Sequence, residues 1–226
     1  MKTTNGIDFP SILAFSVHEM KNSLSTISEL IQNFAKQNAL QHPKELAQLE
    51  FEANRMNNSL MQLLILYKID EAKFCPDIDE HLVSEILNEV LAQQNTLFTI
   101  NGIDLEINCP EDLLCYCDFN LISNALSTVI NNAQRYSNGR ILLSAAREDD
   151  YVCFHIEDDG NGFPGHFLTQ GSADNNTVNL NTGSTGLGLF FVATIAGMHI
   201  NGAKKGMIKL SNDSCMGGAK FSLLLP

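Results

Sequence analysis

Two repeats of apolar residues near the start of the chain constrain its fold more than any other feature. The first repeat is Leu13, Val17, Met20, Leu24, Ile27, Ile31 and Phe34. The second is Leu46, Leu49, Ala53, Met56, Leu60, Leu63 and Tyr67. Spacings of alternately three and four are those of the a and d positions of helices in a bundle or coiled coil. They predict one helix from Pro10 to about Lys36 and a second helix from about Pro43.

A hairpin of two such helices cannot close a core of its own. The natural product is therefore a homodimer in which two antiparallel hairpins form a four-helix bundle. The alternative is that the hairpin packs against the rest of its own chain. The repeat ends near Cys75, and Pro76 stops the helix. We expect a first domain over residues 1–75 and a second over residues 76–226.

The second domain alternates helical and strand patterns. Helices are expected over residues 82–97, 119–136 and 186–199, with Asp118 capping the second of them. Strands are expected over residues 103–108, 140–147, 151–157, 207–212 and 220–225, and the acidic turn 148–150 should join two of these as a pair. This interleaving predicts an α/β sandwich with helices on one face of a sheet. The fold class of the whole chain is then α+β.

Composition excludes several classes of protein. A chain of 226 residues has room for two modest domains, and 44% hydrophobic with 18% charged residues is typical of globular proteins. A net charge of -12 argues against nucleic acid or an anionic membrane as partner, because both require a basic patch. No apolar run approaches the roughly 18 residues of a membrane span, and the first residues do not resemble a signal peptide. We expect a cytoplasmic protein without a membrane span.

The six cysteines are scattered and form no C-x-x-C pair. A zinc site is therefore not expected, and in the cytoplasm the thiols should be reduced. Cys115 and Cys117 would share one face of a strand, where packing is their expected role.

The first helix carries a candidate nucleophile. His18, Glu19 and Asn22 fall between the apolar positions, so they should face water. A histidine beside a carboxylate can stay neutral and nucleophilic at one nitrogen, while Glu19 takes up or orients the ring proton. The alternative is an ordinary solvated histidine on a helix surface.

Three clusters in the second domain carry chemistry, and the first lies on the helix over residues 119–136. Asn132, Arg135 and Tyr136 are three and four residues apart, which places them on one side of that helix. They present a neutral oxygen ligand, a cation and a phenol together. Such a set suits Mg²⁺ and its phosphates, because Mg²⁺ prefers oxygen ligands.

The second cluster is an acid at the end of a strand. Asp158 is followed by Gly160 and Gly162, which allow the backbone to approach a ligand closely. A carboxylate in this place can accept a hydrogen bond from an exocyclic amine such as that of adenine. The alternative is a simple Asp-Gly turn.

The third cluster is a glycine-rich stretch, residues 183–189, that contains Gly186 and Gly188 and leads into a helix. Free N–H groups at such a helix start, together with the helix dipole, favour phosphate oxygens. The stretch has no Gly-Lys-Ser/Thr, so it is not a Walker A motif, and it lacks the context of a dinucleotide fingerprint.

In this order and spacing, the four segments resemble the H, N, G1 and G2 boxes of sensor histidine kinases of two-component systems, from Phe15 to Pro226. The resemblance implies a dimerisation and histidine-phosphotransfer hairpin followed by a Bergerat-type ATP-binding domain. ATP and Mg²⁺ would be its cofactors.

The resemblance also implies roles for individual residues. His18 would accept the γ-phosphoryl group, Glu19 would be the base, and Asn22 would position water in a reverse phosphatase reaction. In the ATP-binding domain it assigns the magnesium ion to Asn132, nucleotide contacts to Arg135 and Tyr136, and adenine to Asp158. The residues that would shape the pocket and its lid hinges are Gly160, Gly162, Gly186 and Gly188. Ser222 matches a family position near adenine.

The expected function is an ATP-dependent protein-histidine autokinase that passes the phosphoryl group to an aspartate of a response-regulator receiver domain. Nothing before Pro10 looks able to bind a stimulus, so the expected partners are a second copy, the receiver domain and a separate sensor protein. One alternative is a histidine phosphotransfer protein with a degenerate nucleotide domain. A chaperone-type or DNA-repair ATPase is disfavoured by the His18 segment.

Overall fold

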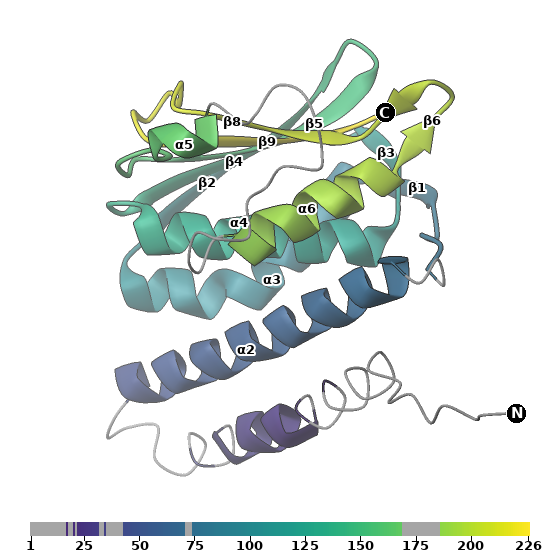
Figure 1. Cartoon of the computed structure of the whole chain (residues 1–226). Coiled ribbons are helices and arrows are strands. Elements are labelled where there is room, and N and C mark those ends of the chain that lie inside the picture. Colours follow the sequence, from purple (N-terminus) through teal and green to yellow (C-terminus); the bar gives the residue numbers. More distant parts are fainter. Residues whose placement is uncertain are drawn as a thin grey trace, which may run out of the picture. The chain divides into compact units, whose positions relative to one another are not determined.

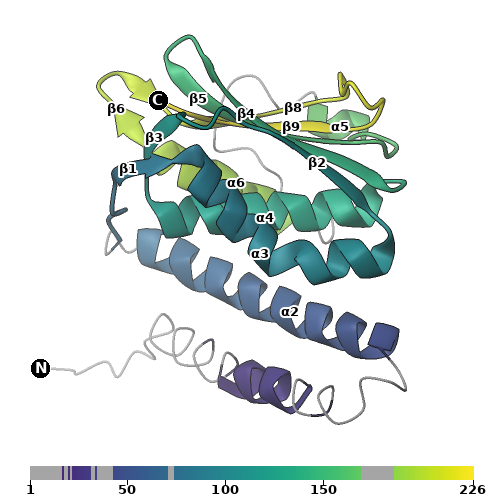
Figure 2. The same cartoon turned by 180° about the vertical axis from the view of Figure 1, so that it is seen from behind.

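The computed structural model describes residues 17, 20, 22–31, 34, 43–70, 74–168 and 186–226. The chain divides into two compact units, residues 1–74 and residues 75–226. Figures 1 and 2 show it from opposite sides. The second apolar repeat ends at Tyr67, within the first of these units.

Apart from Phe74, the described residues of the first unit are helical. Residues 17, 20, 22–31 and 34 are helical, and α2 runs from Pro43 to Asp70. Each repeat buries some of its members, such as Leu24 and Ala53. Other members are roughly half exposed: Met20, Ile27, Phe34, Leu49 and Met56. A single chain therefore covers only part of either apolar repeat.

The second unit is built on a five-stranded sheet whose strand order is β2-β4-β5-β9-β8. The strands are β2 (Asp104–Asn108), β4 (Arg140–Glu148), β5 (Tyr151–Asp158), β8 (Met207–Ser211) and β9 (Lys220–Leu225). The β2–β4 pair is parallel and the other pairs are antiparallel. Three helices cover one face, namely α3 (Val83–Asn101), α4 (Phe119–Tyr136) and α6 (Gly186–Met198) (Figure 1). The predicted α/β sandwich is confirmed.

The core of this unit lies between the sheet and α4 and α6. Nearly all residues of β5 and β9 are buried. Phe154 and Phe221 on these strands are almost completely buried, as are Ile130 of α4 and Phe191 of α6. Burying a side chain of this size contributes about 1.5 to 3 kcal/mol. This layer fixes the ends of α4, β5 and β9 relative to one another.

Asp118 begins α4, as its sequence position predicted. Its side chain accepts a hydrogen bond from the Leu121 N–H at 3.0 Å and another from the Asp77 N–H at 3.0 Å. The Asp118 N–H in turn donates to Nε2 of buried His199, whose Nδ1 lies 2.8 Å from the Ile195 carbonyl oxygen. Losing such a helix cap typically costs about 1 kcal/mol. The network ties the start of α4 to the end of α6.

Smaller elements complete the unit and were not all predicted. β1 (Asp79–Leu82) pairs with β3 (Leu114–Cys117), β6 (Ile200–Asn201) pairs with β7 (Lys204–Lys205), and α5 is a short helix (Gly165–Leu168). Cys115 and Cys117 lie on β3 with both side chains buried. In the part of the chain that the structure describes, no helix combines the length and apolar character of a membrane span.

Candidate functional site

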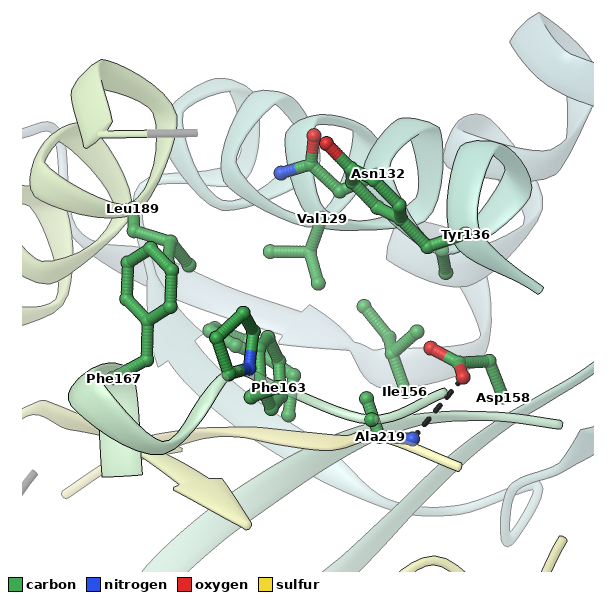
Figure 3. Close-up of a pocket in the computed structure, with 13 residues that line it drawn as sticks. Val129, Asn132, Tyr136, Ile156, Asp158, Phe163, Phe167, Leu189 and Ala219 are labelled. Atoms are coloured by element: carbon green, nitrogen blue, oxygen red, sulfur yellow. Dashed lines mark hydrogen bonds between the residues drawn. The ribbon is translucent and has the colours of Figure 1, made fainter. Parts of the chain in front are cut away.

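A cavity of about 200 Å³ opens between α4, the ends of β5 and β9, and the segment after β5 (Figure 3). Its wall is mostly apolar, with polar groups from Asn132, Tyr136 and Asp158. The lining residues are Val129, Asn132, Ala133, Tyr136, Ile156, Asp158, Gly162, Phe163, Pro164, Phe167, Leu189, Ala219 and Phe221. An apolar cavity with a few fixed polar groups is the usual form of a small-molecule site.

Asp158 is the acceptor fixed at the edge of this cavity. Its side chain is buried, and Oδ1 accepts hydrogen bonds from the Gly160 N–H at 2.8 Å and the Ala219 N–H at 3.1 Å. Within the described residues no donor reaches Oδ2, and Figure 3 shows that oxygen on the side of the cavity. The carboxylate therefore keeps one oriented oxygen for a ligand that donates a hydrogen bond.

The loop before β9 holds Asp158 from the other side. The Gly218 N–H and the Ser214 hydroxyl both donate to the Asp158 carbonyl oxygen at 3.1 Å. A Cβ atom at Gly218 would lie 2.4 Å from that oxygen and 2.5 Å from Oδ1, so no other residue fits without a shift. Sequence reasoning missed Gly218. Its signal is the Gly217-Gly218 pair directly before a strand pattern.

Gly160 and Gly162 permit close backbone contacts near the cavity. A Cβ atom at Gly160 would lie 2.2 Å from the Tyr136 carbonyl oxygen at the end of α4. Gly162 has φ of 77°, and a Cβ atom there would meet the Asn212 side chain at 2.8 Å. Asn212, which sequence reasoning also missed, accepts from the Phe163 N–H at 2.7 Å and donates to the Phe163 carbonyl oxygen at 3.1 Å. Both glycines therefore shape the segment that lines the cavity.

On α4 the structure separates the three predicted residues. Asn132 and Tyr136 line the cavity, whereas Arg135 does not. The Arg135 guanidinium carbon lies 5.6 Å from the centroid of the Tyr136 ring. The Asn132 side chain, drawn in Figure 3, brings an amide to the cavity wall.

The start of α6 lies next to Asn132. A Cβ atom at Gly188 would stand 3.0 Å from the Thr128 methyl group and 4.0 Å from Asn132 Nδ2. Gly186 is the first residue of this helix. The close packing at Gly188 thus brings the first turn of α6, with the N–H groups and positive dipole end of a helix start, beside the Asn132 amide.

The remaining predicted residues are not among those that line the cavity. Ser222 follows Phe221 on β9 and therefore points to the opposite face of the sheet from the cavity. Its hydroxyl lies 2.8 Å from Nδ1 of His155. His18 and Glu19 fall outside the described residues. Asn22 lies on the helical stretch 22–31 of the first unit and is exposed.

The neighbours of Asp158 serve the fold rather than the cavity. Asp159 Oδ1 accepts hydrogen bonds from the N–H groups of Asn138, Gly139 and Arg140 at 2.8 to 3.1 Å. Burial alone would raise the pKa of the Asp159 carboxyl, but these bonds outweigh it and hold the pKa below its ordinary value. Glu157 points away from the helices and accepts from the Cys215 N–H at 2.7 Å. Only the middle acid of the three faces the cavity.

Comparison with known proteins identifies this unit. Residues 117–226 match the family described as histidine kinase-, DNA gyrase B-, and HSP90-like ATPase. The sensor histidine kinase CpxA of Escherichia coli (strain K12) is 28% identical over 195 residues, and the sensor protein DivL of Caulobacter vibrioides is 28% identical over 190 residues. The chain is a homologue of sensor histidine kinases. These matches cover 81% and 80% of the chain but only 40% of CpxA and 24% of DivL.

Solved histidine kinases have the same fold. The Acinetobacter baumannii histidine kinase AdeS aligns with a TM-score of 0.60 at 21% identity, covering 92% of this chain and 96% of that one. Full-length ShkA in complex with AMPPNP aligns with a TM-score of 0.63 at 17% identity, covering 96% of this chain and 46% of that one. This chain therefore has the same fold as these two structures, although only about a fifth of the aligned residues are identical.

Proposed function

We propose that the chain is an ATP-dependent protein-histidine autokinase, which phosphorylates His18 and passes the phosphoryl group to an aspartate of a response-regulator receiver domain. The observation that carries this proposal is that Asp158 and Asn132 line the same cavity. One is a fixed acceptor at the edge of an apolar cavity, and the other presents a side-chain amide in the wall of the same cavity. The kinship with sensor histidine kinases supports it.

The cavity fits an adenine base. Apolar side chains such as Val129, Ile156 and Phe221 offer surfaces to a flat ring, while Oδ2 of Asp158 accepts a hydrogen bond from its exocyclic amine. Since Oδ1 is already held by two N–H groups, the second oxygen keeps its orientation before the ligand arrives. Such preorganisation favours adenine over a base that presents a carbonyl oxygen at that position.

The wall formed by α4 and α6 fits magnesium and phosphates. Asn132 would hold Mg²⁺ through its amide oxygen, in keeping with the preference of this ion for oxygen ligands. The first turn of α6 at Gly186 and Gly188 would direct N–H groups to phosphate oxygens. Tyr136 would contact the nucleotide from the cavity wall, and Arg135, which lies beside the Tyr136 ring, would contact its phosphates. When bound, Mg²⁺ neutralises charge on the phosphates during transfer.

The first unit supplies the nucleophile in this proposal. A neutral His18 attacks the γ-phosphorus with its unprotonated ring nitrogen, and the bond to the ADP oxygen breaks. Glu19 accepts the proton from the other ring nitrogen. Asn22, one turn further along the helix, would orient water when the phosphoryl group is removed from the receiver domain.

The half-exposed members of the apolar repeats support a homodimer. A second copy would cover Met20, Ile27 and Phe34 together with Leu49 and Met56, which one chain leaves roughly half exposed. Hydrophobic burial contributes about 25 cal/mol per Å², so covering them stabilises a four-helix bundle. Since the phosphoryl donor is ATP, we place the reaction in the cytoplasm.

Incubation with γ-labelled ATP and Mg²⁺ tests this function. Wild-type chain should acquire label that is lost in acid and kept in base, as expected for phosphohistidine. Asn132→Ala should slow labelling by at least about 10- to 100-fold, the usual loss when the surroundings of a bound metal ion are altered. Asn201→Ala, which changes an exposed residue of β6 outside the cavity, is the matched control.

Two outcomes would contradict the proposal. Label that withstands acid would point to a different amino acid as the acceptor. A wild-type chain that binds no nucleotide, yet accepts label from another phosphorylated protein, would favour the histidine phosphotransfer protein instead.

A further inference from the structure

A second group of reactive side chains lies on the face of the sheet opposite the helices. Glu148 ends β4, and Cys153 and His155 lie two residues apart on β5, so the latter two point to the same face. One ligand atom from each of these three residues lies within 4.8 Å of the other two. The β4–β5 hairpin that carries them is seen from both sides in Figures 1 and 2.

The imidazole in this group is oriented by a hydroxyl. Nδ1 of His155 lies 2.8 Å from the Ser222 Oγ, and Nε2 lies 3.0 Å from Glu148 Oε1. In the free chain, the Nε2–H of His155 donates to Glu148 and Nδ1 accepts from the Ser222 hydroxyl. A metal ion on Nε2 would take the place of that ring proton, and the proton would then lie on Nδ1 and be donated to Ser222. Histidine ligands of metal ions are commonly fixed in this way by a partner on their other nitrogen.

Burial makes two of the three groups rigid and leaves the third adjustable. Cys153 is fully buried and His155 is 9% exposed, whereas the Glu148 side chain is 57% exposed. The residues opposite Cys153 and His155 on β4 are the small Ala146 and Ser144. On β9, Leu224 lies opposite Cys153 and Ser222 lies opposite His155. The exposed Glu148 side chain can adjust by rotation without disturbing the core.

The surrounding charges are mixed. Lys209 lies opposite Ser222 on β8, and Lys220 forms an ion pair with Glu157 at 3.3 Å. The hydrogen bond from His155 lowers the pKa of Glu148, so this carboxyl is ionised at neutral pH. A thiolate and a carboxylate together would supply two negative charges against the nearby lysines.

We infer that Glu148, Cys153 and His155 form a binding site for a divalent cation of the zinc type. Thiolate, imidazole and carboxylate are the ligands of Zn²⁺, whereas Mg²⁺ avoids sulfur. Tetrahedral Zn²⁺ with bonds of about 2.0 to 2.3 Å requires ligand atoms roughly 3.5 Å apart. The 3.0 Å between His155 Nε2 and Glu148 Oε1 would therefore widen slightly, which rotation of the exposed Glu148 side chain allows. Water would fill the fourth position.

Zn²⁺ binding would replace the S–H bond of Cys153 by an S–Zn bond. Burial raises the pKa of the Cys153 thiol to about 11, so the free chain carries this proton at neutral pH. Zn²⁺ displaces it: the S–H bond breaks, the S–Zn bond forms, and the proton leaves to solvent. The site differs from the proposed Mg²⁺ position at Asn132, which lies in the cavity on the helix side of the sheet.

Cysteine spacing alone indicated no zinc site. The ligands are separated by four residues and by one, in a pattern without C-x-x-C, and they meet only because the β4–β5 hairpin folds Glu148 back toward His155. The register of the β4–β5 hairpin brings the three ligands together, so a search for local cysteine motifs does not find this site.

Titration of the whole chain with Co²⁺ tests this site, because a cobalt–thiolate bond gives a charge-transfer absorption that other ligands do not. The expected result is one Co²⁺ per chain, displaced by Zn²⁺ and not by excess Mg²⁺. Cys153→Ala should abolish the absorption, and Ser222→Ala should weaken binding about 10- to 100-fold. Cys215→Ala removes an exposed thiol and should change nothing.

No absorption in the wild-type chain would overturn the inference, as would equal loss in Cys215→Ala and Cys153→Ala. Circular dichroism would show whether Cys153→Ala still folds. If it does not, Glu148→Gln decides the matter, since its exposed side chain can be changed without touching the core. Unchanged Zn²⁺ affinity in folded Glu148→Gln would contradict the site.

Discussion

Replacing Asp158 by asparagine isolates the contact that the nucleotide-binding proposal requires. Oδ1 of the native side chain accepts from the N–H groups of Gly160 and Ala219. The amide oxygen of an asparagine can accept both bonds in the same place, so the fold should survive. The amide nitrogen then replaces Oδ2 and presents a donor to the adenine amine, which is itself a donor.

The expected loss follows from the type of bond removed. A hydrogen bond to a charged group contributes about 1.5 to 3 kcal/mol, so Asp158→Asn should weaken ATP by about 10- to 150-fold. Calorimetry with a non-hydrolysable ATP analogue and Mg²⁺ would measure it. Asp159→Asn is the matched control. Asp159 bonds to residues 138–140 between α4 and β4 and does not line the cavity, so this change should leave affinity within about twofold.

A reciprocal ligand makes the test sharper. Inosine triphosphate carries a carbonyl oxygen where ATP carries the amine, so wild type should bind it weakly and Asp158→Asn should bind it better than wild type does. Equal affinities of wild type and Asp158→Asn for ATP would refute the assignment of adenine to Asp158. A loss of ATP affinity in Asp159→Asn as large as that in Asp158→Asn would refute it too.

Other predictions concern stability and assembly. Gly160→Ala should lower the free energy of unfolding by about 1 to 3 kcal/mol in urea, because its Cβ meets backbone at 2.2 Å, whereas open Gly165→Ala should change it by less than about 0.5 kcal/mol. Met56→Glu places a charge on the exposed part of an apolar repeat and should give monomers in light scattering; an unchanged dimer would contradict the bundle. Burial lowers the pKa of His199, so the unfolded chain takes up a proton before the folded one, and stability should fall as pH drops below about 6.5. In urea titrations, the free energy of unfolding of His199→Gln should not show this fall with pH. The same fall in wild type and in His199→Gln would refute the burial argument.

Local signals in the sequence predicted most of the second unit. The Asp118 cap with its apolar period marked α4, and the acidic turn marked the β4–β5 hairpin, where Asp149 takes a φ of 51°. The strands near residues 207–212 and 220–225 appear close to their predicted positions as β8 and β9. The cap, the turn and the strand patterns each depend on neighbouring residues of the chain, so they can be recognised without knowledge of contacts between distant segments.

The remainder depends on contacts between distant segments. β1 is four residues long, and α5 likewise, so neither has a period that a sequence pattern could reveal. Asn212 and Gly218 matter because they meet Phe163 and Asp158, more than 45 residues away in the chain. Strand alternation placed Ser222 on one face or the other but could not say which. Its pairing with His155 decides that it faces away from the cavity.

Phosphosite mapping tests the central claim most directly. The wild-type chain is incubated with Mg²⁺ and ATP, digested without acid, and analysed by mass spectrometry beside His18→Ala. The account predicts a phosphoryl group on His18 alone and an unmodified His18→Ala chain that still binds nucleotide. A phosphoryl group on any other residue, or undiminished phosphorylation of His18→Ala, would contradict it.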